Sequence, residues 1–376
     1  MVKYYIIAGE ASGDLHGSNL IKALKKTDQN ARFRAWGGDM MEAAGADVVK
    51  HYRDLAFMGF AEVVMNLRTI LNNLSFCKKD ILNYKPDTLI LIDYPGFNLR
   101  IAKWAKTQGL KIIYYISPQV WAWKENRVNT IKKCVDKMLV ILPFEKAFYQ
   151  KWHYDVTYVG HPLVEVIDEY SKKDAGTNNI LSSIQKPLIA LLPGSRKQEI
   201  LKKLPVMLEV SKIFPDYQFV VAKAPGQDDN FYKELLSHYP GVKSVSGKTY
   251  DLLLHAKAAL VTSGTATLET ALFGVPEVVC YKGSPVSYAI AKRVINIKYI
   301  SLVNLIMDKP VVKELIQHEL TVENVVKELN DILNNPERIQ QLGSDYQQLR
   351  DILSRGGHAS DNAAKAINSF LQGEPS

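Results

Sequence analysis

The strongest constraint on the fold is a series of short apolar runs that alternate with helical patterns along the whole chain. The runs are apolar nearly throughout, which is typical of parallel strands that helices cover on both faces. A stretch rich in Lys, Asp, Asn and Ser, residues 171–185, divides the series in two. The pattern predicts an α/β fold with two Rossmann-like, doubly wound domains. The predicted strands are residues 4–8, 32–36, 88–93, 111–116, 137–141 and 157–159, then 187–192, 218–222, 242–244, 258–262 and 277–281.

The length of 376 residues is sufficient for two such domains. We place an N-terminal domain at residues 1–165, a second domain at 166–345 and C-terminal helices at 346–376, which pack on the first domain or on a partner. Ligands of doubly wound domains bind at the carboxyl ends of the strands, and two facing domains form a cleft. The loops that follow the strands are therefore the candidate sites.

The composition limits the partners and cofactors to expect. The 47 Lys and Arg against 39 Asp and Glu give a net charge of +8, which permits a phosphorylated substrate or an anionic membrane surface. Basic and acidic residues alternate, so we expect no nucleic-acid partner. The 3 cysteines and 8 histidines are dispersed, which argues against disulfides and a metal site. No apolar run approaches the ~18 residues that span a bilayer. We expect a cytoplasmic protein that touches membrane only at its surface.

The first loop, residues 8–14, joins the first predicted strand to a helix. Its glycines permit a close approach of the backbone to a ligand. It has neither the Gly-x-Gly-x-x-Gly spacing of dinucleotide-binding loops nor a Gly-Lys-Ser/Thr phosphate loop. The carboxylates of Glu10 and Asp14 would oppose a phosphate and suit sugar hydroxyls. The alternative is that Ser12 or Asp14 caps the helix.

Two more features of the first half follow strands. Asp93 ends a buried strand, where burial would raise its pKa and make it a candidate general base. Alternatively, its carboxylate hydrogen-bonds the turn at residues 94–96. Trp121 and Trp123 line an apolar or sugar-stacking surface, or they pack in the core or between domains.

The second half contains two loops suited to a diphosphate. Each follows a predicted strand and opens a helix, whose N-terminus favours anions. Arg196 adds a guanidinium fork for a phosphate, and Glu269 can accept hydrogen bonds from ribose hydroxyls. For either loop alone, ordinary helix capping is the alternative. The candidate nucleotide-binding residues are Gly194, Ser195, Arg196, Ser263, Gly264, Thr265, Ala266, Glu269 and Tyr281.

An apolar stretch at residues 55–76 has partly helical spacing, with Lys78 and Lys79 nearby. It predicts a membrane-facing or acyl-binding surface, because apolar side chains flanked by Lys and Arg suit an anionic bilayer. The alternative is a core helix. The candidate surface residues are Phe57, Phe60 and Val64, and Met58 is assigned to the substrate.

Together the motifs resemble the lipid-A-disaccharide synthases, a family of glycosyltransferases with two Rossmann-like domains in the GT-B arrangement. The resemblance extends over nearly the whole chain. The motifs that carry it are AGEASGD at 8–14, LAFMGFAEV at 55–63, IDYPGFN at 92–98, SPQVWAWKENRV at 117–128, LPFEKAFY at 142–149, VGHPL at 159–163, LLPGSR at 191–196, SGTATLE at 263–269 and YISLVNL at 299–305.

The resemblance implies a reaction and a location. An inverting transfer would join UDP-2,3-diacylglucosamine to 2,3-diacylglucosamine 1-phosphate (lipid X). The products would be UDP and a β-1,6-linked lipid A disaccharide 1-phosphate, in Gram-negative bacteria. The family needs no metal or other cofactor and works at the inner face of the inner membrane. Some members form homodimers.

The resemblance also implies roles for individual residues. Asp93 matches the candidate base that would deprotonate the acceptor 6-hydroxyl, and Arg196 matches an essential arginine. Glu269 and Asn304 match polar residues important for activity, and Asn304 is assigned to the acceptor. Many relatives have a second acid where this chain has Gly96, which leaves Asp93 as the base candidate of its loop.

Glu10 and Ser12 match the first-loop signature. We assign Glu10 to catalysis, and Ser12 and Asp14 to the substrate. Two other classes remain open: another UDP-sugar enzyme of this architecture, such as a UDP-N-acetylglucosamine 2-epimerase, and a membrane-surface protein that binds nucleotide sugars without turnover. An NAD dehydrogenase is disfavoured, because the fingerprint glycines and the ribose carboxylate are missing.

Overall fold

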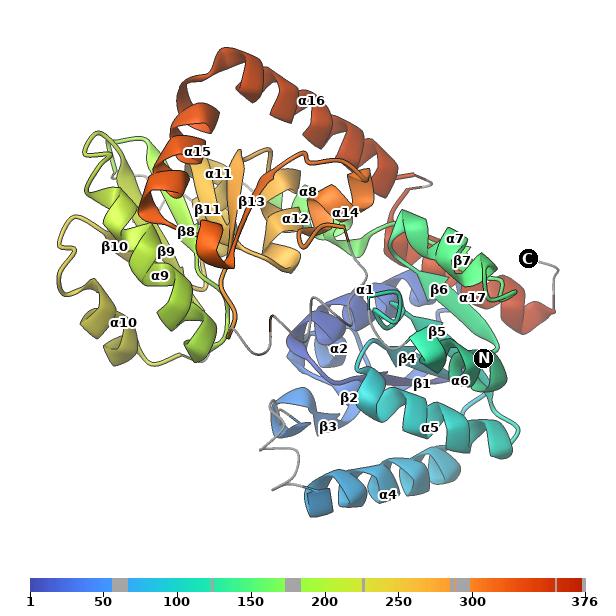
Figure 1. Ribbon diagram of the computed structural model, residues 1–376. Coiled ribbons are helices and arrows are strands. Elements are labelled where there is room, and N and C mark those ends of the chain that lie inside the picture. The colour runs from blue at the N-terminus through green and yellow to red at the C-terminus, as the bar shows by residue number, and fades with distance from the viewer. Residues whose placement is uncertain are drawn as a thin grey trace. The chain divides into compact units, whose positions relative to one another are not determined.

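The computed structural model describes residues 1–55, 67–122, 125–172, 184–224, 227–284, 288, 298–355 and 357–373. The chain forms two compact units (Figure 1). The first contains Met1–Pro162 together with Leu353–Ser376, and the second contains Leu163–Ile352. The sequence pattern placed these divisions near residues 165 and 345.

The first unit is built on a parallel sheet of seven described strands in the order β3-β2-β1-β4-β5-β6-β7. The order of the first six strands is that of a dinucleotide-binding Rossmann domain. Strands are added toward one edge from β1 to β3 and toward the other edge from β4 onward, so the strand order switches between β1 and β4. The strands are β1 (Lys3–Ala8), β2 (Arg32–Gly37), β3 (Asp47–His51), β4 (Thr88–Ile92), β5 (Lys111–Tyr115), β6 (Lys137–Val140) and β7 (Thr157–Tyr158).

Helices cover both faces of this sheet, which explains why its central strands β1, β4 and β5 are apolar at nearly every position. Along β1, Tyr5 and Ile7 join the core on one face, whereas Tyr4 and Ile6 join the core on the other. The described helices that pack on the first face are α4 (Leu67–Tyr84), α5 (Pro95–Thr107), α6 (Val128–Cys134) and α7 (Pro143–Gln150). Those on the second are α1 (Ala11–Thr27), α2 (Asp39–Ala43) and α17 (Ala359–Gln372). Short 3₁₀ turns lie at Tyr52–Leu55 and Glu125–Arg127.

The C-terminal helix α17 belongs to the first unit, although it follows the whole second unit in sequence. In Figure 1 it is the red helix among blue and green elements. It packs along α1, and Ala363, Ala364 and Ile367 are buried in the core of that face. The C-terminal residues therefore complete the N-terminal unit.

The second unit is a similar parallel sheet of six described strands, in the order β10-β9-β8-β11-β12-β13. The strands are β8 (Leu188–Leu192), β9 (Gln218–Lys223), β10 (Lys243–Ser246), β11 (Ala256–Thr262), β12 (Glu277–Tyr281) and β13 (Lys313–Ile316). The described helices are α8 (Pro162–Lys172), α9 (Lys197–Ser211), α10 (Asp229–Leu236), α11 (Thr249–His255), α12 (Thr265–Leu272), α14 (Leu302–Met307), α15 (Val322–Asn334) and α16 (Pro336–Leu353), with a 3₁₀ turn at Gln317–Glu319.

The two parallel-sheet units confirm the predicted fold class. Two strands, β3 and β13, were not predicted; they lie at sheet edges and carry polar or charged residues within the strand. No helix in the described ranges is both long and apolar enough to cross a membrane.

Candidate functional site

The first candidate site lies at the carboxyl ends of β1 and β4. These strands pair in parallel, with Ala8 opposite Ile92, so the residues that follow them reach the same edge of the sheet. Glu10 comes from the first strand and Asp93 from the second. The topology thereby brings together the two carboxylates that the sequence analysis assigned to catalysis.

The backbone of Asp93 is held in an uncommon conformation. Asp93 and Tyr94 have φ angles of 42° and 51°, in the left-handed region, which costs a non-glycine residue about 1–3 kcal/mol. The carbonyl oxygen of Asp93 accepts hydrogen bonds from the amide of Asn98 at 2.7 Å and from the hydroxyl of Tyr114 at 2.6 Å. The Asn98 amide also contacts the carbonyls of Ile7 and Ile92. These buried partners offset the strain and aim Asp93 away from the regular path of the strand.

The surroundings of Asp93 shift the pKa of its carboxyl group toward neutral pH. Burial, and after it the nearby charge of Glu10, raise the pKa of Asp93 from 3.8 to about 6, while a hydrogen bond with the Tyr94 backbone acts in the opposite direction. A general base is most effective when its pKa lies close to the working pH. Glu10 lies at the N-cap of α1 without making a side-chain capping bond.

A close packing contact fixes the loop beside these carboxylates. A Cβ atom on Gly9 would lie 2.4 Å from the ring of Tyr94, so only glycine fits there. The Tyr94 ring in turn stacks on Phe97, with 5.6 Å between ring centroids. The glycine of the first loop therefore accommodates an aromatic ring from the neighbouring loop.

The carboxylate of Asp14 has backbone hydrogen-bond partners that the sequence did not predict. It is 3% exposed, and its carboxylate accepts hydrogen bonds from the backbone N–H groups of Gly38, Met40 and Met41 at 2.7–3.1 Å. Asp14 thus caps the N-terminus of α2. The alternative interpretation of the sequence, in which Asp14 caps the helix that follows the first strand, is wrong, because Asp14 lies within that helix, α1. Ser12 is exposed.

Packing accounts for the position of Trp121. Its ring meets Phe144 edge-on, with 4.9 Å between centroids and an angle of 86°. Trp123 lies outside the described residues, as do Phe57, Met58, Phe60 and Val64. The described end of the apolar stretch is α4, on which Leu74 is buried while Leu71 and Phe76 are 55% and 47% exposed.

The second candidate site is a cavity of about 450 Å³ at the carboxyl ends of the strands of the second unit. It brings together eight of the nine predicted nucleotide-binding residues, and Tyr281 is not among the described residues that line it. Gly194 and Gly264 have φ angles of 109° and 141°, which let the two loops turn tightly. The full lining is Leu192, Gly194, Ser195, Arg196, Glu199, Ala222, Lys223, Ala224, Thr249, Thr262, Ser263, Gly264, Thr265, Ala266 and Glu269.

Two carboxylates of this cavity have defined partners. Glu269 accepts a hydrogen bond from the hydroxyl of Tyr250 at 2.8 Å, and burial raises the pKa of Glu269. Glu199 lies between two cations, 3.6 Å from the guanidinium of Arg196 and 3.7 Å from the ammonium of Lys203. Neither Glu199 nor Lys203 was predicted as a site residue, although their spacing of four residues on a helix places them on one face.

Asn304 lies deep in the second unit, where it is 1% exposed. Its amide donates to the Val312 carbonyl and to Glu314, each at 2.9 Å, and its carbonyl accepts from the Val312 backbone at 2.9 Å. It therefore joins α14 to the segment that leads into β13. The side chain is fully engaged by protein groups.

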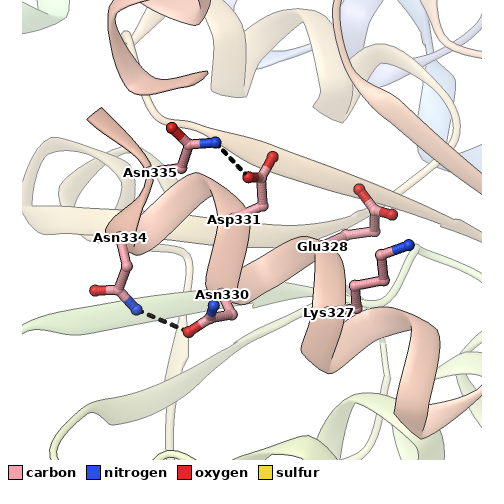
Figure 2. A pocket seen from close by; sticks show the side chains of 6 residues that line it. All are labelled: Lys327, Glu328, Asn330, Asp331, Asn334 and Asn335. Atoms are coloured by element: carbon pink, nitrogen blue, oxygen red, sulfur yellow. Dashed lines mark hydrogen bonds between the residues drawn. The ribbon is translucent and has the colours of Figure 1, made fainter. Parts of the chain in front are cut away.

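A second cavity, of about 530 Å³, lies along α15 (Figure 2). Its six lining residues, numbers 327–335, come from one helix and its end. Asn335 donates to the carboxylate of Asp331 and Asn334 donates to the amide oxygen of Asn330, each at 2.8 Å. None of these six residues is buried. Among the described residues, no group of three or more His, Cys, Asp or Glu could hold a metal ion.

Comparison with known families gives one consistent match. The family described as lipid-A-disaccharide synthetase matches residues 4–368. The chain is 42% identical to the lipid-A-disaccharide synthase of Syntrophus aciditrophicus over 368 residues, covering 96% of each chain. It is 37% identical to the enzyme of that name from Coxiella burnetii, covering 97% of this chain and 98% of the relative.

Solved structures show the same architecture at low sequence identity. The UDP-N-acetylglucosamine 2-epimerase of Neisseria meningitidis, bound to UDP-GlcNAc, is 13% identical, with a TM-score of 0.70 over 99% of this chain and 100% of that one. The calicheamicin glycosyltransferase is 17% identical, with a TM-score of 0.59 over 99% and 98% of the two chains. Both likenesses concern the fold, and they support the two-domain GT-B architecture.

Proposed function

This chain belongs to the lipid-A-disaccharide synthase family, and we propose that it transfers diacylglucosamine from UDP-2,3-diacylglucosamine to 2,3-diacylglucosamine 1-phosphate. The products are lipid A disaccharide 1-phosphate and UDP. One observation carries the proposal: a chain that matches the family over residues 4–368 has a raised-pKa carboxylate in one unit and an anion-suited cavity in the other.

The cavity of the second unit is the proposed site for the UDP portion of the donor. The loops before α9 and α12 offer backbone N–H groups at helix N-termini, where negative charge is favoured. Arg196 adds a guanidinium, 69% exposed, that can pair with a phosphate. Glu269 would accept hydrogen bonds from ribose hydroxyls. These donors stabilise the charge that develops on the diphosphate as it leaves.

Asp93 is the proposed base. Its carboxylate takes the proton of the acceptor 6-hydroxyl as that oxygen attacks the anomeric carbon. The bond from that carbon to the diphosphate breaks with its electrons on UDP, which inverts the anomeric configuration. Glu10 contributes by raising the pKa of Asp93 toward the working pH.

A direct assay tests the reaction. UDP release from UDP-2,3-diacylglucosamine would be followed with and without lipid X, in detergent and with EDTA. We expect release only with the acceptor, unchanged by EDTA, and a disaccharide 1-phosphate by mass spectrometry. Release with an unacylated acceptor, or UDP binding without any turnover, would contradict the proposed substrates.

We also propose that the protein acts on the inner face of the inner membrane. The exposed Leu71 and Phe76 of α4, with Lys78 and Lys79 on the same helix, support this location. Cosedimentation with anionic vesicles should be weakened in Leu71→Ser/Phe76→Ser and in Phe57→Ser/Phe60→Ser. Ile213→Ser, a change at an exposed apolar residue of the second unit, is the control. Vesicle binding equal to that of wild type in both double variants would overturn the proposal.

We also propose that the protein forms a homodimer, and sedimentation equilibrium tests this.

A further inference from the structure

Lys203 is a buried lysine beneath the proposed nucleotide cavity. Its side chain is only 3% exposed, which is rare for lysine because removing an ammonium from water costs several kcal/mol. Burial lowers the pKa of Lys203, while the neighbouring carboxylate of Glu199 raises it. The burial of the Lys203 ammonium therefore suggests a role beyond packing.

The contacts of Lys203 connect the two loops of the cavity. Its ammonium donates a hydrogen bond to the hydroxyl of Thr262, the last residue of β11 before the 263–266 loop. The same ammonium would lie 3.5 Å from a Cβ atom placed on Gly194, in the other loop. One side chain from α9 thus lies between both loops that would hold the diphosphate.

The charges around Lys203 explain how the cavity can accept an anion. Glu199 lines the cavity, and its negative charge would repel a diphosphate. Lys203 and Arg196 both lie close to this carboxylate, at 3.7 Å and 3.6 Å. The side chain of Arg196 is 69% exposed and has room to turn toward a phosphate, whereas that of Lys203 is buried beside Glu199.

We propose that Lys203 is a positioning residue for the diphosphate of the donor: it keeps the charge of Glu199 neutralised when Arg196 turns to the phosphates, and it holds Thr262 and the Gly194 loop in register. The proposal rests on the proposed function, since it assumes that UDP occupies this cavity.

The experiment measures the binding of UDP and of uridine, which has no phosphate, to the full-length protein by isothermal titration calorimetry. In Lys203→Met, we expect the Kd for UDP to rise about ten- to a hundredfold and the Kd for uridine to stay unchanged. Both ligands are measured on one preparation, so a loss of folded protein alters the stoichiometry and leaves the ratio of the two constants intact. Lys202→Met removes the same charge from the neighbouring position, where the side chain is not buried, and should bind UDP like wild type.

A second variant tests the role of Glu199. The double variant Lys203→Met/Glu199→Gln removes the uncompensated carboxylate, so it should bind UDP more tightly than Lys203→Met alone. An unchanged Kd for UDP in Lys203→Met, or an equal loss of UDP and uridine, would overturn the inference and leave the proposed function standing. Wild-type protein that does not bind UDP would overturn the proposed function itself, and the inference with it.

Discussion

The ring of Tyr94 lies so close to Gly9 that any side chain on Gly9 would overlap it, with a Cβ atom 2.4 Å from the nearest ring atoms. The contact joins the loop after β1 to the loop after β4, next to Glu10 and Asp93. A packing contact outside the reacting groups therefore sets the geometry of the proposed base.

Gly9→Ala should destabilise the protein by about 1–3 kcal/mol, because the Tyr94 ring or the loop must shift, and turnover should fall with it. Urea unfolding and the UDP-release assay measure the two effects. Gly96→Ala is the matched control: a Cβ atom there meets nothing within 4 Å, and alanine suits the first turn of α5. Equal stability of the two variants would refute the steric argument.

Asp93→Asn should lower turnover by about 10²–10⁴, because the variant keeps the shape of the side chain and loses the base. The Kd for UDP should stay at its wild-type value, since the proposed UDP cavity lies in the other unit. Asp155→Asn removes an exposed carboxylate of the same unit and should have no effect. Wild-type turnover in Asp93→Asn would remove Asp93 from the mechanism.

The activity should depend on pH through Asp93. Below its pKa of about 6 the carboxyl group is protonated and cannot accept a proton, so kcat/KM should fall about tenfold per pH unit on that side. Above pH 6 the profile should be flat until another group titrates. The stability of the fold should change with pH in the opposite direction to the activity. The folded state holds this proton more tightly than the unfolded state, so ionising Asp93 between pH 4 and about 6 lowers the free energy of unfolding.

A profile of kcat/KM between pH 4.5 and 8, with protein integrity checked at each point, measures this dependence. The residual activity of Asp93→Asn should lack the acidic limb. A limb that persists in this variant would assign the titration to another group.

Arg196→Ala should raise the Kd for UDP about ten- to a hundredfold, since a charge-assisted contact with phosphate contributes about 1.5–3 kcal/mol. Titration calorimetry measures the constant. Lys197→Ala serves as the control, because Lys197 is adjacent, cationic and packed against Phe231 outside the cavity. Similar losses in both variants would point to general charge rather than a specific contact.

Strands that are buried on both faces could be predicted from the sequence, because nearly every position in them is apolar. The fully buried strands β4 and β8 read as continuous apolar runs and were predicted within one residue. The edge strands β3 and β13 escaped, because contact with a single neighbouring strand leaves room for Lys, Asp and Glu. Charged residues are common on edge strands, although the other two edge strands of this chain, β7 and β10, were predicted.

The site was predicted where its residues follow strands and missed where partners come from elsewhere. The loops at Gly194 and Gly264 could be predicted because their glycines directly follow apolar runs. Nothing local shows that Asp14 caps α2 or that Asn304 binds Val312, since both partners depend on tertiary folding. Lys203 was missed because adjacent lysines on a helix look alike until packing buries one of them.

The placement of α17 has a consequence for synthesis on the ribosome. The chain leaves the first unit after Pro162 and returns at Leu353, and the two crossings meet where the His161 N–H donates to the Leu353 carbonyl at 3.1 Å. The second unit is thus a continuous insertion that emerges complete, whereas the first unit must wait for Ala363, Ala364 and Ile367 to close its core. Residues 1–162 are therefore made before the second unit but finish folding after it, because the apolar face that α17 covers stays exposed until residues 359–372 have been made.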